Sequence, residues 1–203
     1  MRGVLRDWRW DMKKMKKWLY LALTLVCTVA SFCILPSCKK ERKVSTRYEI
    51  TAEYREESKT LSGAVKVEYT NQTGTELTEL KFNLYPNAYR KNALYPPVSE
   101  NYYSIAYYDG ADYGDITITS VNGAKGWSID GVDENILAVR LVSPLSVGDR
   151  VTLDVSFVTE LAKIEHRLGV TDKTVNFGNA FPCLCMYEQG EFVETAYSTF
   201  GDP

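Results

Sequence analysis

The single histidine decides how much chemistry this chain of 203 residues could perform by itself. A hydrolytic zinc ion needs three protein ligands and an activated water, yet the sequence offers only His166 and has no H-E-x-x-H motif. A Ser-His-Asp triad would also have to use His166, and no G-x-S-x-G motif is present. We therefore predict no catalytic and no metal-binding residues, and we expect His166, between Glu165 and Arg167, at the surface.

Two of the five cysteines lie close together, at Cys183 and Cys185. On a β-strand, residues two apart share a face, so this pair could in principle bind a metal. The alternative is that both side chains act as small buried hydrophobic groups, and this interpretation is favoured. The spacing of all five cysteines shows neither a disulfide framework nor a paired C-x-x-C zinc pattern.

A third cysteine, Cys38, stands where an apolar segment ends. Four lysines between residues 13 and 17 precede an uncharged stretch at 18–35, which is typical of an export signal. Residues 35–38, Leu-Pro-Ser-Cys, resemble a bacterial lipobox, in which the cysteine thiol receives the lipid before cleavage. We predict a lipoprotein signal peptide at residues 1–37, forming a signal helix, with lipidation at Cys38.

The acidic residues near the start are unusual for such a signal, so we expect translation to start at Met12 or Met15. Residues 38–46 would form a tether, which places the rest of the chain at the outer side of a bacterial cell membrane, held by the lipid anchor. An uncleaved transmembrane anchor is the alternative, since 18 apolar residues fall within the spanning range. In both cases the body of the protein faces outward.

The net charge of the exported body argues against one class of partner. Of the 24 Lys and Arg residues seven precede residue 38, and of the 26 Asp and Glu residues two do. The remainder therefore carries a net charge of about −7, the opposite of the basic surface that nucleic acid requires. We exclude nucleic acid as a partner.

The body, residues 47–203, has the period-two pattern of β-structure. Alternating apolar residues occur in the segments 47–54, 65–69, 77–85, 116–121, 135–142 and 150–158. Polar turn residues such as Asn122-Gly123 separate these segments. The pattern predicts an all-β fold, an antiparallel β-sandwich or saddle-like sheet, in which one face of each strand is buried.

Tyrosines are concentrated in one segment, residues 85–113, which holds eight of the 14 in the chain and three of the seven prolines. Proline excludes much of this segment from the centre of a sheet. One interpretation is an aromatic surface for sugar or peptide, which would use Tyr102, Tyr103, Tyr107 and Tyr108. The other, which we favour, is a long loop that packs its tyrosines over a sheet edge.

Several motifs of the body are similar to those of one enzyme family. They are Leu-Ser-Gly-x-Val-x-Val-x-Tyr-x-Asn at 61–71, Leu-x-Phe-x-Leu-Tyr-Pro-Asn-Ala at 80–88, Ala-Phe-Pro-Cys at 180–183 and Phe-Gly-Asp-Pro at 200–203. Together they resemble the N-terminal β domain of the zinc aminopeptidases of the aminopeptidase-N type. The resemblance covers residues 47–203.

The resemblance implies a non-catalytic domain that scaffolds the substrate cleft of a catalytic domain missing from this sequence. Zinc would be the cofactor of that missing domain only, and a peptide would be the substrate of the full-length protein. The chain would then be an N-terminal fragment whose β domain is incomplete at its C-terminus. By position in the family, Asn176 and Asn179 are the candidates for cleft-facing residues, without a catalytic role.

Overall fold

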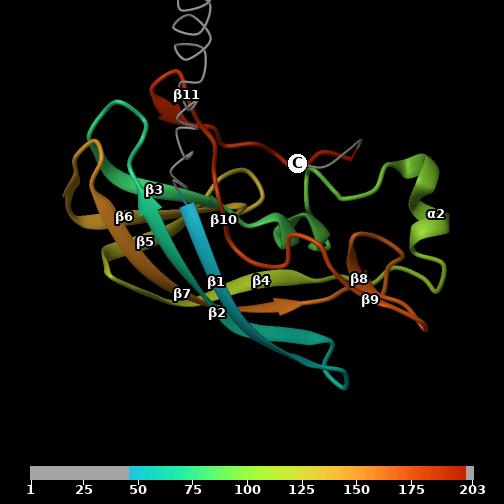
Figure 1. Ribbon diagram of the computed structural model, residues 1–203. Helices are drawn as coiled ribbons and strands as arrows, with labels where there is room; N and C mark the ends of the chain where they lie inside the picture. The colour runs from blue at the N-terminus through green and yellow to red at the C-terminus, as the bar shows by residue number, and fades with distance from the viewer. Residues whose placement is uncertain (1–45, 200–203) are drawn as a thin grey trace, which may run out of the picture. The chain divides into compact units, whose positions relative to one another are not determined.

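The computed structural model describes residues 46–199, which form two antiparallel four-stranded sheets packed face to face (Figure 1). The all-β, sandwich-like fold predicted from the sequence is confirmed. The predicted signal helix, Cys38 and residues 39–45 of the predicted tether lie outside the described residues. The last tether residue, Thr46, is instead the first residue of β1. The helices within residues 46–199 are short, and none has the length and apolar character needed to span a bilayer.

The first sheet contains, in spatial order, β1 (Thr46–Arg55), β2 (Thr60–Thr70), β7 (Arg150–Glu160) and β4 (Asp115–Asn122). The second sheet contains β10 (Cys183–Leu184), β3 (Leu77–Asn83), β6 (Ile136–Leu145) and β5 (Ala124–Asp130). Two small ribbons pair β8 (Leu168–Val170) with β9 (Val175–Phe177), and β11 (Tyr187–Glu188) with β12 (Glu191–Phe192). The tyrosine-rich segment forms η1 (Tyr85–Tyr89), η2 (Glu100–Tyr102) and α2 (Tyr103–Ala106).

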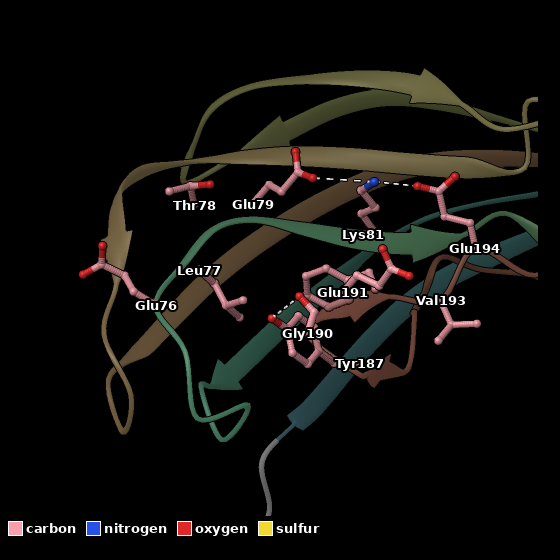
Figure 2. A pocket seen from close by; sticks show the side chains of 11 residues that line it. Glu76, Leu77, Thr78, Glu79, Lys81, Tyr187, Gly190, Glu191, Val193 and Glu194 are labelled. Carbon is pink, nitrogen blue, oxygen red and sulfur yellow. Dashed lines mark hydrogen bonds and ion pairs between the residues drawn. The ribbon is translucent and has the colours of Figure 1, made fainter.

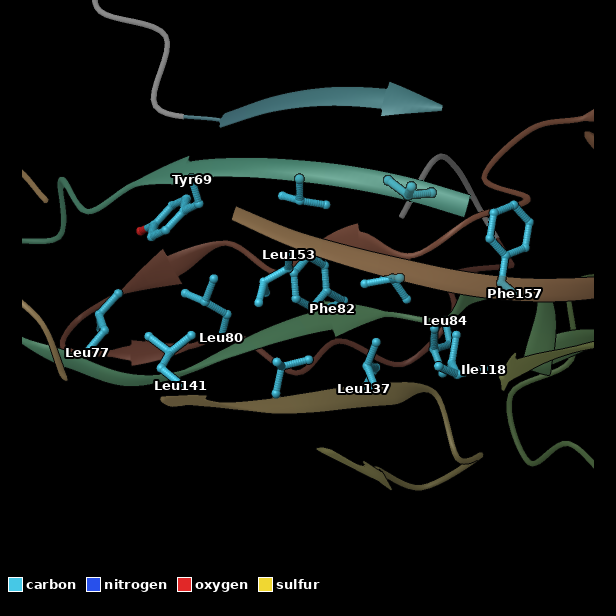
Figure 3. Close-up of a cluster of buried hydrophobic side chains, with 14 of the residues drawn as sticks. Tyr69, Leu77, Leu80, Phe82, Leu84, Ile118, Leu137, Leu141, Leu153 and Phe157 are labelled. Atoms are coloured by element: carbon cyan, nitrogen blue, oxygen red, sulfur yellow. The ribbon is translucent and has the colours of Figure 1, made fainter. Parts of the chain in front are cut away.

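The core lies between the two sheets and follows from the alternation of side chains along each strand (Figure 3). In β2, Val65 and Val67 are fully buried, and they pair with Val155 and Leu153 of β7. Phe82 of β3 packs from the opposite sheet and is also fully buried. Burial of each such side chain contributes roughly 1.5–3 kcal/mol, which makes this layer the main source of stability.

The six predicted strand segments correspond to β1, β2, β3, β4, β6 and β7, and Gly123 has the positive φ of 84° that its predicted turn requires. Strand β5 was not predicted from the sequence. In that strand Trp127 is 36% exposed and no residue is fully buried, so the apolar alternation that identifies a strand is weak. Its pairing with β6 holds β5 in the sheet.

A second group of buried apolar residues closes one end of the sandwich, and we call it the end cluster. It contains Ala88, Tyr89, Val98, Ala106, Tyr107, Leu161, Ala162, Ile164, Leu168, Ala180 and Tyr197. These residues come from the tyrosine-rich segment, from the chain after β7 and from the C-terminal part of the body. The end cluster therefore anchors three segments that are distant in the sequence.

Two buried asparagine side chains form hydrogen bonds to backbone groups that are not paired within the sheets. The side-chain nitrogen of Asn71, fully buried, donates to the carbonyl oxygens of Thr75 and Leu145 at 2.7 and 2.8 Å. Asn87 of η1 donates to the Glu134 carbonyl at 2.5 Å and accepts from the Ile116 amide at 3.0 Å. Because buried polar groups need partners, these contacts hold the loops in one arrangement.

Replacement of Asn71 tests this role. Asn71→Ala leaves two carbonyl oxygens without their donor, so we expect the free energy of unfolding to fall by about 3 kcal/mol. Chemical denaturation monitored by circular dichroism measures the change. The adjacent exposed residue provides the control, and Gln72→Ala should change stability by less than about 0.5 kcal/mol. A loss below about 1 kcal/mol for Asn71→Ala would show that the turns do not depend on this amide.

Candidate functional site

Three adjoining hollows lie over the end cluster and share the loop that contains Glu165 and His166. Their volumes are about 340, 380 and 620 Å³. The walls come from the tyrosine-rich segment, the loop 165–167 and the β8–β9 ribbon, and we call this region the His166 cleft. The Glu165 amide donates to the Ala106 carbonyl at 2.9 Å, which holds this loop against the tyrosine-rich segment.

His166 is half-buried and bound to the end cluster, so the predicted surface position is wrong. Its Nδ1 lies 2.6 Å from the hydroxyl oxygen of Tyr89, a residue that is only 2% exposed. The Tyr89 hydroxyl in turn lies 3.4 Å from that of Tyr197. The Arg167 guanidinium lies over the Tyr197 ring, 5.9 Å from its centroid. No sequence pattern indicates this cluster, because its members are far apart along the chain.

The surroundings decide the protonation state of this imidazole. Burial lowers the pKa of His166, and the positive charge of Arg167 lowers it further. Burial raises the pKa of the Tyr89 hydroxyl, so this hydroxyl stays protonated and shares a hydrogen bond with Nδ1. At neutral pH the imidazole is uncharged, because its pKa lies below the usual 6.5. The cleft can bind a ligand through Nε2 of this ring and through aromatic faces.

The two asparagines assigned by resemblance have different positions. Asn176 lines the largest of the three hollows and donates from its side-chain nitrogen to the His166 carbonyl at 2.8 Å. Its side-chain oxygen makes no hydrogen bond to the described residues and can accept one from a ligand. Asn179 lies in the turn before Ala180 with a φ of 59°, a left-handed conformation that asparagine tolerates well. The structure thus places Asn176 in the cleft and gives Asn179 a role in the turn.

The tyrosine-rich segment agrees in part with each of the two interpretations made from the sequence. Tyr107 is 7% exposed and belongs to the end cluster, so it packs as the loop interpretation predicts. Tyr102 is 61% exposed and lines the 340 Å³ hollow together with Ile105, which is 63% exposed. Tyr103 and Tyr108 are also exposed. These outer side chains provide an aromatic and apolar surface at the cleft.

Ion pairs fix the loops that form the cleft. Asp112 accepts hydrogen bonds from the Lys59 ammonium at 2.5 Å and from the Lys163 backbone amide at 2.8 Å. Burial alone would raise the pKa of Asp112, but these hydrogen bonds outweigh it and the pKa is lowered. The Lys163 ammonium also contacts Asp109 and Asp172, which join the tyrosine-rich segment to the β8–β9 connection.

A further hollow of about 550 Å³ lies beside β3 and the β11–β12 ribbon, and four glutamates line it (Figure 2). Lys81 points between two of them, 2.5 Å from Glu194 and 3.6 Å from Glu79. The hydrogen bond to Glu194 raises the pKa of Lys81 despite partial burial. This arrangement neutralises part of the acidic charge and attaches the C-terminal segment to β3.

The two downstream cysteines pack in the body as free thiols, Cys183 partly buried and Cys185 buried. Burial raises the pKa of Cys183 to about 11 and that of Cys185 to about 12. Both thiols are therefore protonated at neutral pH and unreactive. This agrees with their interpretation as small hydrophobic side chains.

Among residues 46–199, no group of three His, Cys, Asp or Glu side chains converges in a way that could hold a metal. The His166 cleft instead presents one neutral imidazole, one guanidinium, an amide oxygen and several aromatic rings. This set is suited to binding a polar ligand with an apolar part. The assignment of zinc to a domain outside this sequence stays a prediction.

Comparison with known proteins adds no assignment: the chain matches no family model, and no curated protein sequence matches it.

The titration of His166 tests the geometry of the cleft. His166 is the only histidine, so NMR of the imidazole follows its titration without ambiguity. We expect a pKa below the usual 6.5. The stability gained by burying a neutral imidazole is then fully present above about pH 6.5 and is lost as the pH falls through the lower folded-state pKa.

One variant tests the electrostatic cause. Arg167→Gln removes a repelling charge, so it should raise the pKa of His166. Tyr69→Phe, in the core between the sheets, should leave it unchanged. A wild-type pKa at or above 6.5 would contradict the described environment.

Proposed function

We propose that this chain is the non-catalytic β domain of an outward-facing, membrane-anchored peptidase of the aminopeptidase-N type. In this proposal the His166 cleft forms one wall of the peptide-binding cleft, and a further domain supplies the zinc and the catalytic residues. The anchor is the lipid on Cys38, in the cell membrane of a bacterium.

One observation carries the proposal. Resemblance alone selected Asn176 and Asn179 as cleft-facing residues, and Asn176 lines the same hollow as His166 and Arg167, whereas Asn179 does not. A side-chain amide oxygen can accept a hydrogen bond from a peptide N–H, and the ring nitrogen Nε2 of an imidazole offers a second hydrogen-bonding group to the peptide backbone. The two most distinctive motifs of the resemblance, at 80–88 and 180–183, also contain Asn87 and Ala180, which hold the end cluster and its loops.

A second candidate function is supported by the exposed aromatic residues. Tyr102 and Ile105 present more than half of their surfaces to solvent beside the 340 Å³ hollow. In this alternative the protein is a surface lipoprotein that binds glycan or peptide through the tyrosine-rich segment. Glycan-array binding that is lost with Tyr102→Ala, Tyr103→Ala and Tyr108→Ala, but kept with Tyr113→Ala, would favour it.

The peptidase proposal predicts which further motifs the natural gene encodes. We expect the reading frame to continue past codon 203 into a segment with H-E-x-x-H and a downstream glutamate. In that product Asn176→Ala should raise the KM for peptide substrates about fivefold with little change in kcat, because it removes one hydrogen bond worth about 1 kcal/mol. Steady-state kinetics measures both constants.

The matched control is Asn179→Gly, which keeps the left-handed turn and removes only the side chain. It should leave KM unchanged. A stop codon directly after Pro203 would contradict the peptidase proposal. An unchanged KM for Asn176→Ala would contradict the role of the cleft wall while leaving the peptidase assignment intact.

Metabolic labelling tests the anchor. In a bacterial host the full chain should incorporate radiolabelled palmitate, and Cys38→Ser should abolish the label because only a thiol can form the thioether. Cys33→Ser, within the apolar segment, provides the control and should keep the label. Equal labelling of the Cys38→Ser variant would contradict the lipoprotein assignment.

A further inference from the structure

Strand β1 forms one edge of the first sheet. It pairs along its whole length with β2, and no other described strand pairs with its opposite side. Ten residues of extended backbone, Thr46–Arg55, therefore offer one row of hydrogen-bonding groups to a further strand. This length distinguishes β1 from β10, the edge strand of the other sheet, which has only two residues.

The hydrogen-bonding pattern of the first sheet shows which residues of β1 direct their backbone N–H and C=O groups away from β2. At the two ends of the β2–β7 ladder, the Asn71 amide donates to the Asp149 carbonyl and the Leu161 amide donates to the Lys59 carbonyl, both at 2.9 Å. Because hydrogen bonding alternates along a strand, odd-numbered residues of β2 bond to β7 and even-numbered ones bond to β1. The β1–β2 register then directs the backbone groups of the odd-numbered residues of β1 toward β2. The even-numbered residues of β1 point theirs to the free edge.

The same even-numbered residues carry an uncovered apolar face. Ile50 pairs with Val65, so both side chains lie on the core side of the sheet, yet Val65 is fully buried and Ile50 is 41% exposed. Tyr48 is 36% exposed, although its hydroxyl accepts from the Leu184 amide at 2.9 Å and its ring contacts Phe181. The second sheet covers the inner face of β2 but leaves that of β1 largely open.

The charged side chains on the opposite face of β1 indicate which strand could pair with its free edge. Within the chain, Arg47 lies 3.9 Å from Glu68 and Glu53 lies 3.7 Å from Arg55. In an antiparallel pair of two β1 strands with Ile50 facing Ile50, Arg47 of each copy also faces Glu53 of the other. Tyr48 then faces Ala52, and residues 46–54 of both copies overlap. The strand is thus complementary to itself in both charge and apolar contacts.

The neighbouring registers fit less well. With Thr51 facing Thr51, Arg47 would face Arg55 and Glu49 would face Glu53, which places like charges opposite each other. With Ala52 facing Ala52, Glu49 would face Arg55, but the overlap shrinks to residues 49–55. Repulsion between like charges excludes the register centred on Thr51. The shorter overlap disfavours the register centred on Ala52.

We infer that β1 is a dimerisation edge, which pairs antiparallel with β1 of a second copy of this chain across a two-fold axis at Ile50. About ten backbone hydrogen bonds can form in this register, because each hydrogen-bonded pair exchanges two. The pairing joins two first sheets into one continuous eight-stranded sheet and covers the apolar face of Tyr48 and Ile50. This inference does not depend on the proposed peptidase function.

Cysteine cross-linking of the full chain in membranes tests the contact and its register together. Ile50→Cys should form a disulfide-linked dimer on mild oxidation, since directly opposed residues lie about 5.5 Å apart between Cα atoms, within disulfide range. Thr51→Cys and Ala52→Cys, one and two residues along, should give far less dimer. Val142→Cys, on β6 and 70% exposed, measures the dimer yield from random collisions. The unmodified chain measures the dimer yield from its native cysteines.

Dimer yield for Ile50→Cys no higher than for Val142→Cys would overturn the inference. A maximum at Thr51→Cys or Ala52→Cys would overturn the assigned register.

Exchanging the charges of Arg47 and Glu53 in the Ile50→Cys variant provides a second test. Arg47→Glu alone and Glu53→Arg alone should each lower the dimer yield roughly fivefold, and the two together should restore it. A double variant whose dimer yield does not exceed that of either single variant would overturn this charge pairing, since the single variants already lose the in-chain contacts Arg47–Glu68 and Glu53–Arg55.

Discussion

The two sheets bury their apolar faces against one common layer of side chains, and every other element is positioned from this layer. Val65 and Leu153 of the first sheet meet Phe82 and Val139 of the second. Since side chains alternate along a strand, a shift of one residue would turn each of these groups toward water. The register of the central strands is therefore determined by burial, and the connections must adapt to it.

The end cluster is the main consequence for the candidate site. It collects segments from three parts of the chain and buries Tyr89 beneath the loop of His166. Burial keeps the imidazole uncharged, and the ion pairs of Asp112 and Lys163 hold the surrounding loops from outside. The cleft is thus a rigid surface for hydrogen bonding and aromatic contact, whereas cation chemistry would need ligands that the described residues do not bring together.

Strands β1 and β2 illustrate how the same alternation produces two different surfaces. Both carry apolar residues at every second position, but only β2 lies over the second sheet. The face of β1 remains open beside its unpaired backbone edge, at a distance in the sequence from the cleft loops. The edge is therefore available for self-association and the cleft for a ligand, because different residues form the two surfaces.

Six of the strands, the all-β class and the turn at Gly123 were predictable from the sequence, because a period of two and a positive φ are local properties of the backbone. The resemblance in the sequence also directed attention to Asn176. Folding, in contrast, leaves Ile50 exposed while Val65 is buried, and brings His166 to Tyr89, 77 residues away. Burial and pKa depend on neighbours that folding brings together from distant positions, and no short stretch of sequence contains that information.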